Sequence, residues 1–467
     1  MKKVRLQLKR VALYAIVLLY LWGANACMNQ AHSDTEETHD LAVSLQEKTD
    51  KLVIFRPPLM ADLTDAAVQT FREKFPEVEV EYVSFGDMME EQSQTNYRSV
   101  LMNDISAGKG PDVILWSWEF TDIFKVILTD VFENIDPYMS QDPEFSSQDY
   151  VEGVMNGGVF QGRRWIVPLY YSVGFLVSTE KALADSGFPL IKDPSFSQWY
   201  EAILSQEENM KKRNCTFSNM YGAQNDLTMV GRTGISVLDY ANGQSLARDE
   251  AFQQAMEINK LLYTQAKESY EPGWWDTWSP LPGDDVLSVR DGEILFAYAD
   301  SPGSWLELYS GFLDVDTPVC YPFLSLNTGG GIAEIQQSAA IRKNSKNQVN
   351  AYEFIKILLS QSVQSAGNPY YRYYPIRKES LISVMTESAK LAVRCSVRDD
   401  SVIFQPIVQE TMEQLIYMAQ NVKSAPNSNQ LATEFVMQHM QPFFKGDKTY
   451  ESCLESLVNT LELYVLE

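Results

Sequence analysis

Histidine and basic residues are scarce in this sequence, and each shortage argues against a class of function. Only 3 histidines occur among 467 residues, which is too few for a histidine-based catalytic triad or a structural zinc site. There are 38 lysines and arginines against 62 aspartates and glutamates, a formal net charge of −24. We expect no binding to nucleic acid, because such binding needs cations to neutralise the phosphates.

Cysteines are few and lie far apart. Four of them form neither a dense disulfide framework nor a CxxC metal motif: Cys215, Cys320, Cys395 and Cys453. Free buried thiols and disulfides are both open for these four residues, and we expect no metal site.

Long apolar runs are also rare, and Val11–Trp22, which follows a basic start, is too short to span a membrane comfortably. We therefore predict that residues 1–27 are an export signal. The Ala24-Asn25-Ala26 sequence before Cys27 fits ordinary signal-peptidase cleavage or an imperfect bacterial lipobox. We favour the lipobox, because acylation explains the cysteine and would tether the protein to a membrane. Residues 28–50 are polar and acidic and predict a flexible tether.

From residue 51 the pattern predicts alternating strands and helices. Lys51–Phe55 and Asp112–Trp118 are typical of buried strands, and Val78–Val83 alternates like a half-buried one. Leu63–Phe75 has helical spacing. Strands separated by helices in this way predict right-handed crossovers in a mainly parallel sheet. Gly231–Ala266 is predicted to be largely helical.

Two proline-containing stretches interrupt this order. In the first, Trp165–Tyr171 and Gly174–Ser178 are predicted to be extended. One continuous strand would fit, but we favour a strand that leaves one sheet, exposes two tyrosines and enters a second sheet. Pro318–Phe323 has the same character, and Gly329–Ile341 predicts a strand that returns to the first sheet. From Ser380 to Glu467 the pattern predicts helix throughout.

Motifs for catalysis are missing. There is no G-x-S-x-G elbow and no HExxH, and the glycine-rich runs lack the features of a phosphate loop. Carboxylate pairs such as Asp112 and Glu119 could serve a glycosidase, but with 62 acidic residues they are expected by chance. Solvated surface charge explains them better.

Aromatic residues gather at predicted strand ends and in loops bounded by glycine or proline. Core packing is open for each, but together they lie where an open α/β sheet binds ligands. Flat aromatic faces suit sugar rings, and neighbouring charged groups could bind hydroxyls. The candidate ligand-binding residues are Arg56, Trp116, Trp118, Glu119, Tyr170, Tyr171, Trp274, Trp275, Asp300, Trp305, Tyr371 and Arg372.

Seven segments, in order, carry a resemblance to a known family: Phe71–Val83, Ile105–Ser117, Trp165–Leu183, Phe196–Ile203, Arg290–Trp305, Asn347–Gln364 and Phe443–Leu457. They resemble the extracellular solute-binding proteins of ABC transporters, the group that includes maltose-binding protein. The resemblance implies that Trp305, after a Pro-Gly turn, is a sugar-stacking tryptophan. It also implies ligand contacts just after the third strand and at the first crossover.

The resemblance implies an α/β fold of the two-lobed periplasmic-binding type (type II-like), each lobe a mixed, mainly parallel sheet flanked by helices and joined to the other by hinges. We expect residues 51–170 and 318–347 in the N-terminal lobe and residues 171–317 and 348–467 in the C-terminal lobe.

The function expected from the resemblance is binding, not catalysis. We expect a monomer without a cofactor that binds a sugar or oligosaccharide and delivers it to permease subunits. It would work at the extracellular face of the bacterial membrane, lipid-anchored, or else secreted or periplasmic. Two alternatives stay open: a secreted glycan-active enzyme, and a ligand-presenting sensor subunit of a signalling receptor.

Overall fold

The computed structural model divides the chain into two units, Met1–Leu45 and Gln46–Glu467. The predicted export signal, Cys27 and nearly all of the predicted tether lie outside the described residues. The structure describes residues 50–57, 60–83, 101–105, 107–116, 122–191, 194–206, 208–209, 212, 216–218, 234–269, 282–324, 330–366, 373–390, 395–397, 400–402, 405–426 and 429–466. Within these ranges, no helix is both long and apolar enough to cross a membrane.

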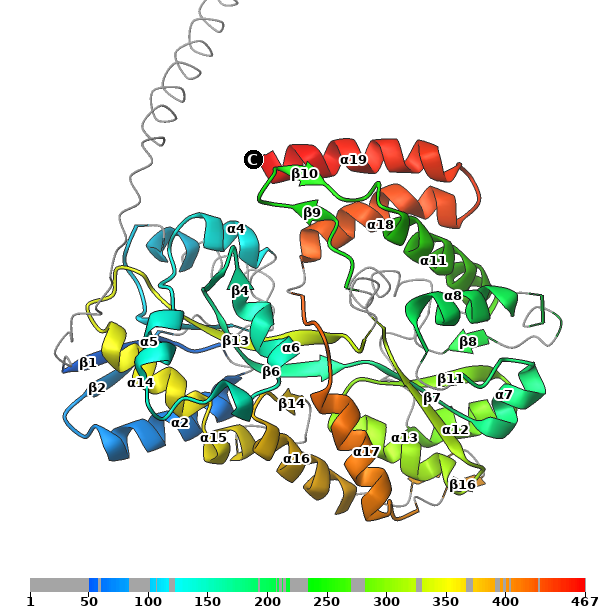
Figure 1. Cartoon of the computed structure of the whole chain (residues 1–467), viewed down its shortest axis with the longest axis horizontal. Helices are drawn as coiled ribbons and strands as arrows, with labels where there is room; N and C mark the ends of the chain where they lie inside the picture. Colours follow the sequence, from blue (N-terminus) through cyan, green and yellow to red (C-terminus); the bar gives the residue numbers. More distant parts are fainter. Residues whose placement is uncertain are drawn as a thin grey trace, which may run out of the picture. The chain divides into compact units, whose positions relative to one another are not determined.

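The first sheet has six strands in the order β14-β6-β13-β3-β1-β2 (Figure 1). Strand β1 (Lys51–Phe55) pairs in parallel with β2 (Glu79–Val83) and with β3 (Val113–Trp116), as predicted. The helix α2 (Ala61–Lys74) connects β1 to β2. It forms an amphipathic helix because its apolar residues Leu63, Ala67, Val68 and Phe71 recur at helical spacing and make one buried stripe.

The other three strands of this sheet run antiparallel to their neighbours. They are β6 (Val167–Val173), β13 (Ala333–Ile341) and β14 (Tyr374–Pro375). The return of β13 to the first sheet confirms the prediction for Gly329–Ile341. The sheet is therefore mixed.

The second sheet has four strands in the order β12-β7-β11-β8. They are β7 (Phe175–Thr179), β8 (Thr216–Ser218), β11 (Ile294–Ala299) and β12 (Pro318–Pro322). Since β6 lies in the first sheet and β7 in the second, the chain passes from one sheet to the other at Gly174. The prediction of a strand that changes sheets is confirmed.

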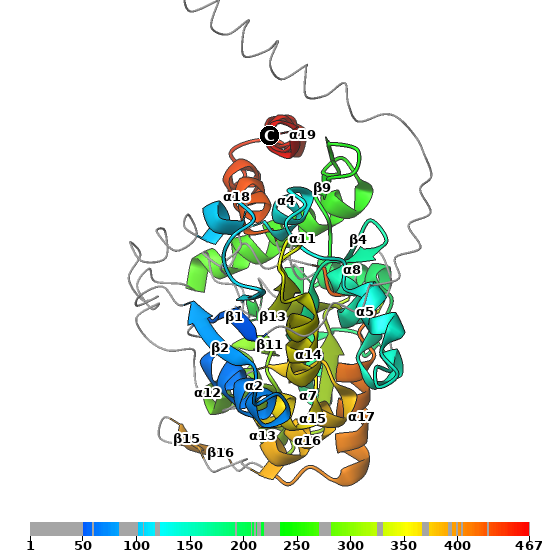
Figure 2. The same cartoon turned by 90° about the vertical axis from the view of Figure 1, so that its left-hand side faces the viewer.

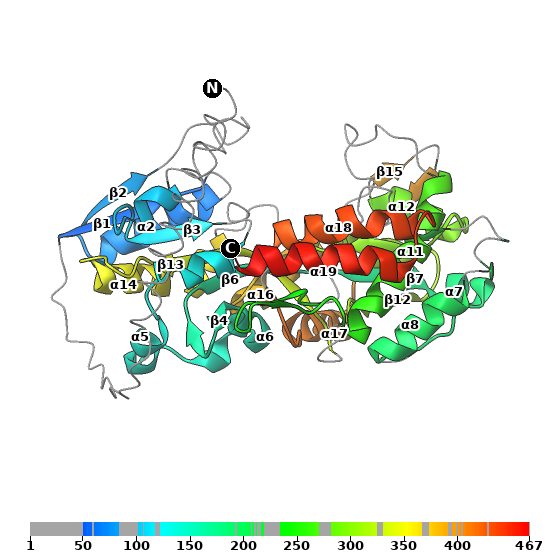
Figure 3. The same ribbon diagram turned by 90° about the horizontal axis from the view of Figure 1, so that it is seen from above.

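Helices flank both sheets, so the α/β fold class is confirmed (Figures 1 and 3). The longer ones are α4 (Ile123–Leu128), α5 (Asp136–Gln141), α7 (Glu180–Ser186), α8 (Phe196–Ser205), α11 (Glu250–Ser269), α12 (Pro282–Arg290), α13 (Pro302–Phe312), α14 (Gln348–Leu358), α15 (Gln361–Ala366), α16 (Lys378–Lys390), α17 (Gln409–Gln420), α18 (Gln430–Phe444) and α19 (Tyr450–Leu466). We call the first sheet with its helices the first half, and the second sheet with its helices the second half.

One hydrophobic core runs through both halves. It includes Leu52 and Val113 of the first sheet as well as Ala297 and Leu306 of the second half. Helix α16 packs on α13 in the second half and on β14 in the first sheet. The two halves therefore share an apolar backing.

Two regions predicted to be helical contain hairpins. Within Gly231–Ala266, β9 (Leu238–Asp239) and β10 (Gln244–Ser245) pair antiparallel before α11 begins. The turn between them contains Asn242-Gly243, a dipeptide that favours hairpins, and Gly243 has φ +63°. In the C-terminal stretch, β15 (Cys395–Val397) pairs with β16 (Asp400–Val402).

Two segments lie elsewhere than the predicted lobe boundaries put them. Residues 348–375 were predicted in the C-terminal lobe, but α14 packs on α2 and β14 pairs with β6 in the first sheet. Residues 318–322 were predicted in the N-terminal lobe, but β12 pairs with β7 in the second sheet. An amphipathic pattern shows that a segment has a buried face, not which sheet it covers.

Candidate functional site

Three segments pass between the two sheets and are hydrogen-bonded side by side. The N–H of Phe323 donates to the carbonyl of Gly174 at 2.9 Å. The N–H of Ala333 donates to Ser424 at 2.9 Å, and that of Lys423 donates to Gly331 at 2.7 Å. We call the chain at Gly174, at 322–324, at 330–333 and at 421–426 the crossing band.

Helix α6 (Glu152–Met155) and the turn after it support the third segment of this band. A Cβ on Gly153 would lie 2.3 Å from the carbonyl oxygen of Val422, and one on Gly157 would lie 2.3 Å from that of Ala425. Real Cβ atoms do not approach backbone oxygens so closely. These two glycines therefore let the helix touch the backbone of the crossing band.

The prediction that Tyr170 and Tyr171 are exposed is wrong, because both side chains are fully buried. The hydroxyl of Tyr170 donates to the carbonyl of Gln364 at 2.7 Å, and that of Tyr171 donates to Ala419 at 2.9 Å. Burial raises the pKa of both hydroxyls. In this structure the two tyrosines anchor α15 and α17 to β6 and present no ring face to a ligand.

Trp305 is likewise 0% exposed. Its ring stacks on Phe175 with a centroid distance of 3.7 Å, and its indole N–H donates to the thiol of Cys320 at 3.1 Å. The position follows from the helix: Ser301 and Ser304 form the capping box of α13, Pro302 occupies its first turn, and Trp305 turns inward. No ring face of Trp305 is free for a sugar here.

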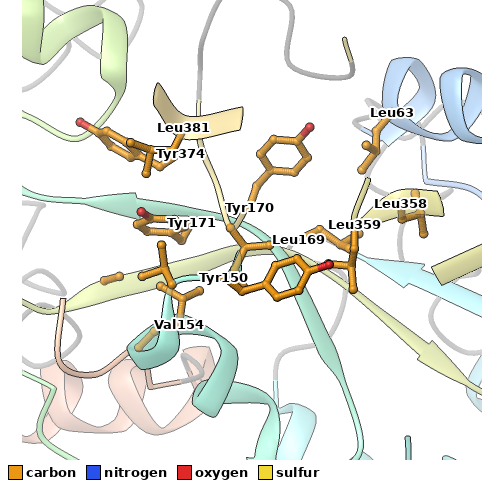
Figure 4. Close-up of a cluster of buried hydrophobic side chains, with 14 of the residues drawn as sticks. Leu63, Tyr150, Val154, Leu169, Tyr170, Tyr171, Leu358, Leu359, Tyr374 and Leu381 are labelled. Atoms are coloured by element: carbon orange, nitrogen blue, oxygen red, sulfur yellow. The ribbon is translucent and has the colours of Figure 1, made fainter. Parts of the chain in front are cut away.

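These aromatic rings meet at Tyr374 in β14. Its ring lies beside that of Tyr171 (Figure 4), with 5.6 Å between the ring centroids, and 6.4 Å from the ring centroid of Trp305. Its hydroxyl is buried and has no hydrogen-bond partner among the residues that the structure describes. Burial raises the pKa of this hydroxyl, and the charge of Asp300 raises it further. Tyr171 and Trp305, which were both predicted, are thus brought together around Tyr374, which was not.

Asp300 is exposed at the carboxyl end of β11 and accepts a hydrogen bond from the Tyr298 hydroxyl at 3.3 Å. The end of β1, in the first sheet, differs from this. Arg56, after β1, pairs with Asp65 at 2.6 Å, and its guanidinium lies 5.1 Å from the ring centroid of Tyr82. Arg56 is therefore held at the α2–β2 edge of the sheet.

Trp116 ends β3, is 5% exposed and stacks on Phe132 at 6.0 Å. It belongs to the core and not to an open surface. The other predicted residues lie outside the described residues: Trp118, Glu119, Trp274, Trp275, Tyr371 and Arg372.

A polar pair that the sequence did not reveal lies between β6 and β13 of the first sheet, next to the crossing band. The amide of Gln336 donates to the Ser172 hydroxyl at 2.9 Å, where the register of β6 and β13 shifts. Such irregularities re-aim side chains and are frequent near functional sites. Nothing in the local sequence marks a bulge here, because it depends on a strand more than 160 residues away.

A cavity of about 1050 Å³ opens on the first half, beside α5 and α6. It is lined by Tyr150, Glu152 and Arg164, among others, and by none of the twelve predicted residues. Burial lowers the pKa of Arg164, and Asp136, at 3.2 Å, opposes that shift. Within the described residues, no group of three or more acidic, histidine or cysteine side chains could hold a metal ion.

Comparison with known proteins gives a consistent result. The sequence model of a family described as bacterial extracellular solute-binding protein matches residues 57–365. No curated protein matches this sequence.

Many solved structures share the fold at low sequence identity. The sugar-binding protein MalE from Xanthomonas citri is 14% identical with a TM-score of 0.62, over 89% of this chain and 97% of that one. A family 1 extracellular solute-binding protein from Alicyclobacillus acidocaldarius is 14% identical with a TM-score of 0.55, over 90% and 100%. A cyclo/maltodextrin-binding protein complexed with maltotetraose is 14% identical with a TM-score of 0.54, over 90% and 98%.

Proposed function

The chain belongs to the family of bacterial extracellular solute-binding proteins, and we propose that it binds a sugar or oligosaccharide between its two halves and delivers it to the permease of an ABC importer. The observation that carries this proposal is the crossing band. Two sheets that are joined by hydrogen-bonded crossing segments and backed by a shared apolar core can turn about that band. A ligand that contacts both halves then favours the closed state.

The proposed polar ligand contacts are one exposed carboxylate and one hydrogen-bonded pair. Asp300 offers the exposed carboxylate at the end of β11, and the half-buried Gln336, which donates to the buried Ser172, offers an amide next to the crossing band. Trp118, Glu119, Trp274, Trp275, Tyr371 and Arg372 are proposed as further contacts. The role of Tyr170, Tyr171 and Trp305 is proposed to be support of this site from the core, with Trp116 and Arg56 bracing the first sheet.

The protein is proposed to act without catalysis, as a monomer, anchored by an acylated Cys27 at the extracellular face of the membrane. The acidic composition and the absence of catalytic motifs support binding over turnover. The sugar-binding proteins that share its fold support carbohydrate as the ligand class.

The test is a panel of sugars that includes maltose and maltotetraose, followed by tryptophan fluorescence and thermal shift. Binding should change the fluorescence and raise the melting temperature in proportion to ligand concentration. Incubation with the same sugars should release no reducing ends. Measurable turnover would favour the glycan-active enzyme. If no sugar of the panel changes the fluorescence or the melting temperature, carbohydrate is excluded as the ligand class.

A further inference from the structure

Asp122 ties together three segments that are far apart in the sequence. It begins α4, and its Oδ1 accepts the N–H groups of Phe124 and Lys125 at 3.0 and 3.2 Å. Its Oδ2 accepts the hydroxyls of Tyr240 and Tyr464, each at 2.6 Å. The residue is 6% exposed. Both carboxylate oxygens are fully engaged, and hydrogen bonds to a charged acceptor are stronger than neutral ones.

Two further residues reinforce this contact. The ammonium of Lys125 donates to the carbonyl of Tyr464 at 2.6 Å and lies 3.8 Å from its ring centroid. There the cation also meets the negative end of the α19 dipole. The amide of Asn429 donates to the Tyr240 hydroxyl, and its backbone forms a bridge with Asp122. We call Asp122, Lys125, Tyr240, Asn429 and Tyr464 the Asp122 cluster.

The cluster joins the two halves. Helix α4 buries Ile123 and Val126 in a core that contains Ile114 and Trp116 of β3, so it belongs to the first half. Helix α19 shares a different core with α11, α18 and the β9–β10 hairpin. Helix α11 in turn packs on α8 and on β8 of the second sheet. The tyrosines therefore come from the second half and the carboxylate from the first.

The cluster also lies off the axis about which the halves can turn. In Figures 1 and 2, α4, β9 and α19 lie above β13, the strand that continues from the crossing band, and α16 and α17 lie below it. A rotation about the crossing band that parts the halves on the upper side must pull Asp122 away from Tyr240 and Tyr464. The apolar backing on the lower side need not break.

We propose that the Asp122 cluster is a latch between the two halves, which must open before they part and which sets how readily the empty protein opens. Asp122 begins a helix just beyond the end of β3, and Asn429 follows the third crossing segment, so the latch adjoins the proposed ligand site. The effect on ligand affinity rests on the proposed function. The effect on opening does not.

The test is the double variant Tyr240→Phe, Tyr464→Phe, which removes both hydroxyls and keeps both rings and the Lys125 contact. Loss of two charge-assisted hydrogen bonds between the halves should shift the open-to-closed ratio by about tenfold or more. Small-angle X-ray scattering of the ligand-free protein should then show a larger radius of gyration. Tyr352→Phe is the matched control, because the Tyr352 hydroxyl donates to Asp142 at 3.0 Å within the first half. It should scatter like the wild type.

A second readout is the dissociation constant for maltotetraose. If the ligand binds the closed form, the double variant should bind about tenfold more weakly, since closing costs more. Scattering identical to that of the wild type would overturn the latch, even if the variant melts at a lower temperature, because the cluster would then be ordinary packing. If the wild type does not bind maltotetraose, that bears on the proposed function, and scattering still decides the latch.

Discussion

At the scale of single residues, three fully buried tyrosines differ in whether the hydroxyl group has a hydrogen-bond partner. The hydroxyls of Tyr170 and Tyr171 each donate to a backbone carbonyl, whereas that of Tyr374 has no hydrogen-bond partner within the described part of the chain. A buried hydroxyl that loses its contacts with water and gains none costs stability. The sign of a Tyr→Phe substitution should therefore depend on the position.

We expect Tyr374→Phe to raise the free energy of unfolding by about 1 kcal/mol, because it removes an unsatisfied buried group. Tyr171→Phe should lower it by about 1 kcal/mol, because it deletes a hydrogen bond to Ala419. Urea unfolding followed by circular dichroism measures both. Effects of the same sign in the two variants would contradict this assignment.

Cys320 and Cys453 should be unreactive in the folded protein. Cys320 and Cys453 are both free, so the choice left open by the sequence is decided for these two. Burial raises the pKa of the Cys320 thiol, although the indole N–H of Trp305 partly offsets the shift. Little thiolate is then present at pH 8. Labelling with iodoacetamide and peptide mass spectrometry should find Cys320 modified only after unfolding, and rapid labelling of the native protein would contradict this.

At the scale of elements, close approach and buried charge determine how segments meet. Helix α6 can touch the crossing band because Gly153 and Gly157 lack a Cβ. Similarly, the residue after α5 is fixed to α14: Asp142 accepts from Lys356 at 2.9 Å and from the Tyr352 hydroxyl.

Gly153→Ala should destabilise the protein by about 1–3 kcal/mol, because the new methyl group would overlap the Val422 carbonyl. Gly303→Ala is the control, since nothing lies within 4 Å of its Cβ position and φ is not positive. It should be neutral or slightly stabilising in the first turn of α13. Thermal unfolding distinguishes the two, and equal effects would show that the close approach is relieved at no cost.

The ion pair at Asp142 should make stability depend on pH. Burial raises the pKa of this carboxyl, but hydrogen bonds from Lys356, the Glu144 N–H and Tyr352 outweigh burial and lower it. A lowered folded-state pKa means that the stabilisation is present above the ordinary carboxyl pKa and is lost as pH falls through the folded value. Asp142→Asn should therefore be less stable than the wild type at pH 7, and the difference should shrink at pH 3.

The control for this pH dependence is Asp185→Asn, whose pair with Lys181 is exposed. We expect a change within about 0.5 kcal/mol at either pH. Urea unfolding at the two pH values gives the comparison. A constant gap between wild type and Asp142→Asn would show that Asp142 does not titrate differently on folding.

At the scale of the whole molecule, the halves are held by a crossing band, an apolar backing and the Asp122 cluster. Attachment to the cell is a separate matter, and we propose that it depends on Cys27, which lies outside the described residues. Two acyl chains on one cysteine would hold the protein firmly at a membrane.

Cys27→Ser should therefore move the protein from the membrane fraction to the soluble fraction of a bacterial host that lipidates exported proteins. Its melting temperature and sugar response should stay as in the released wild type, since the described residues are unchanged. Immunoblotting of the fractions gives the distribution. A wild type that is already soluble would favour ordinary signal-peptidase cleavage.

Local patterns determined the elements and the change of sheet. The limits of β1 agree with those predicted, and Pro168 beside two extended runs marked the strand that leaves the first sheet at Gly174. Apolar period and turn residues are properties of neighbouring positions, so the sequence contains them directly. The Asn242-Gly243 turn is also a local pattern that favours a hairpin, and it lies within a stretch that was predicted to be largely helical.

Only the tertiary structure decided which aromatic faces are covered. Turn residues of the kind found in binding loops lie next to both Trp305 and Tyr171. In the folded chain, however, Phe175 covers Trp305, and Tyr374 and α17 cover Tyr171, and in each case the covering residue is distant in the sequence. The latch at Asp122 was equally invisible, because its partners lie 118 and 342 residues away along the chain. Burial and hydrogen bonding of this kind depend on how separate elements meet, and that depends on the folding of the whole chain.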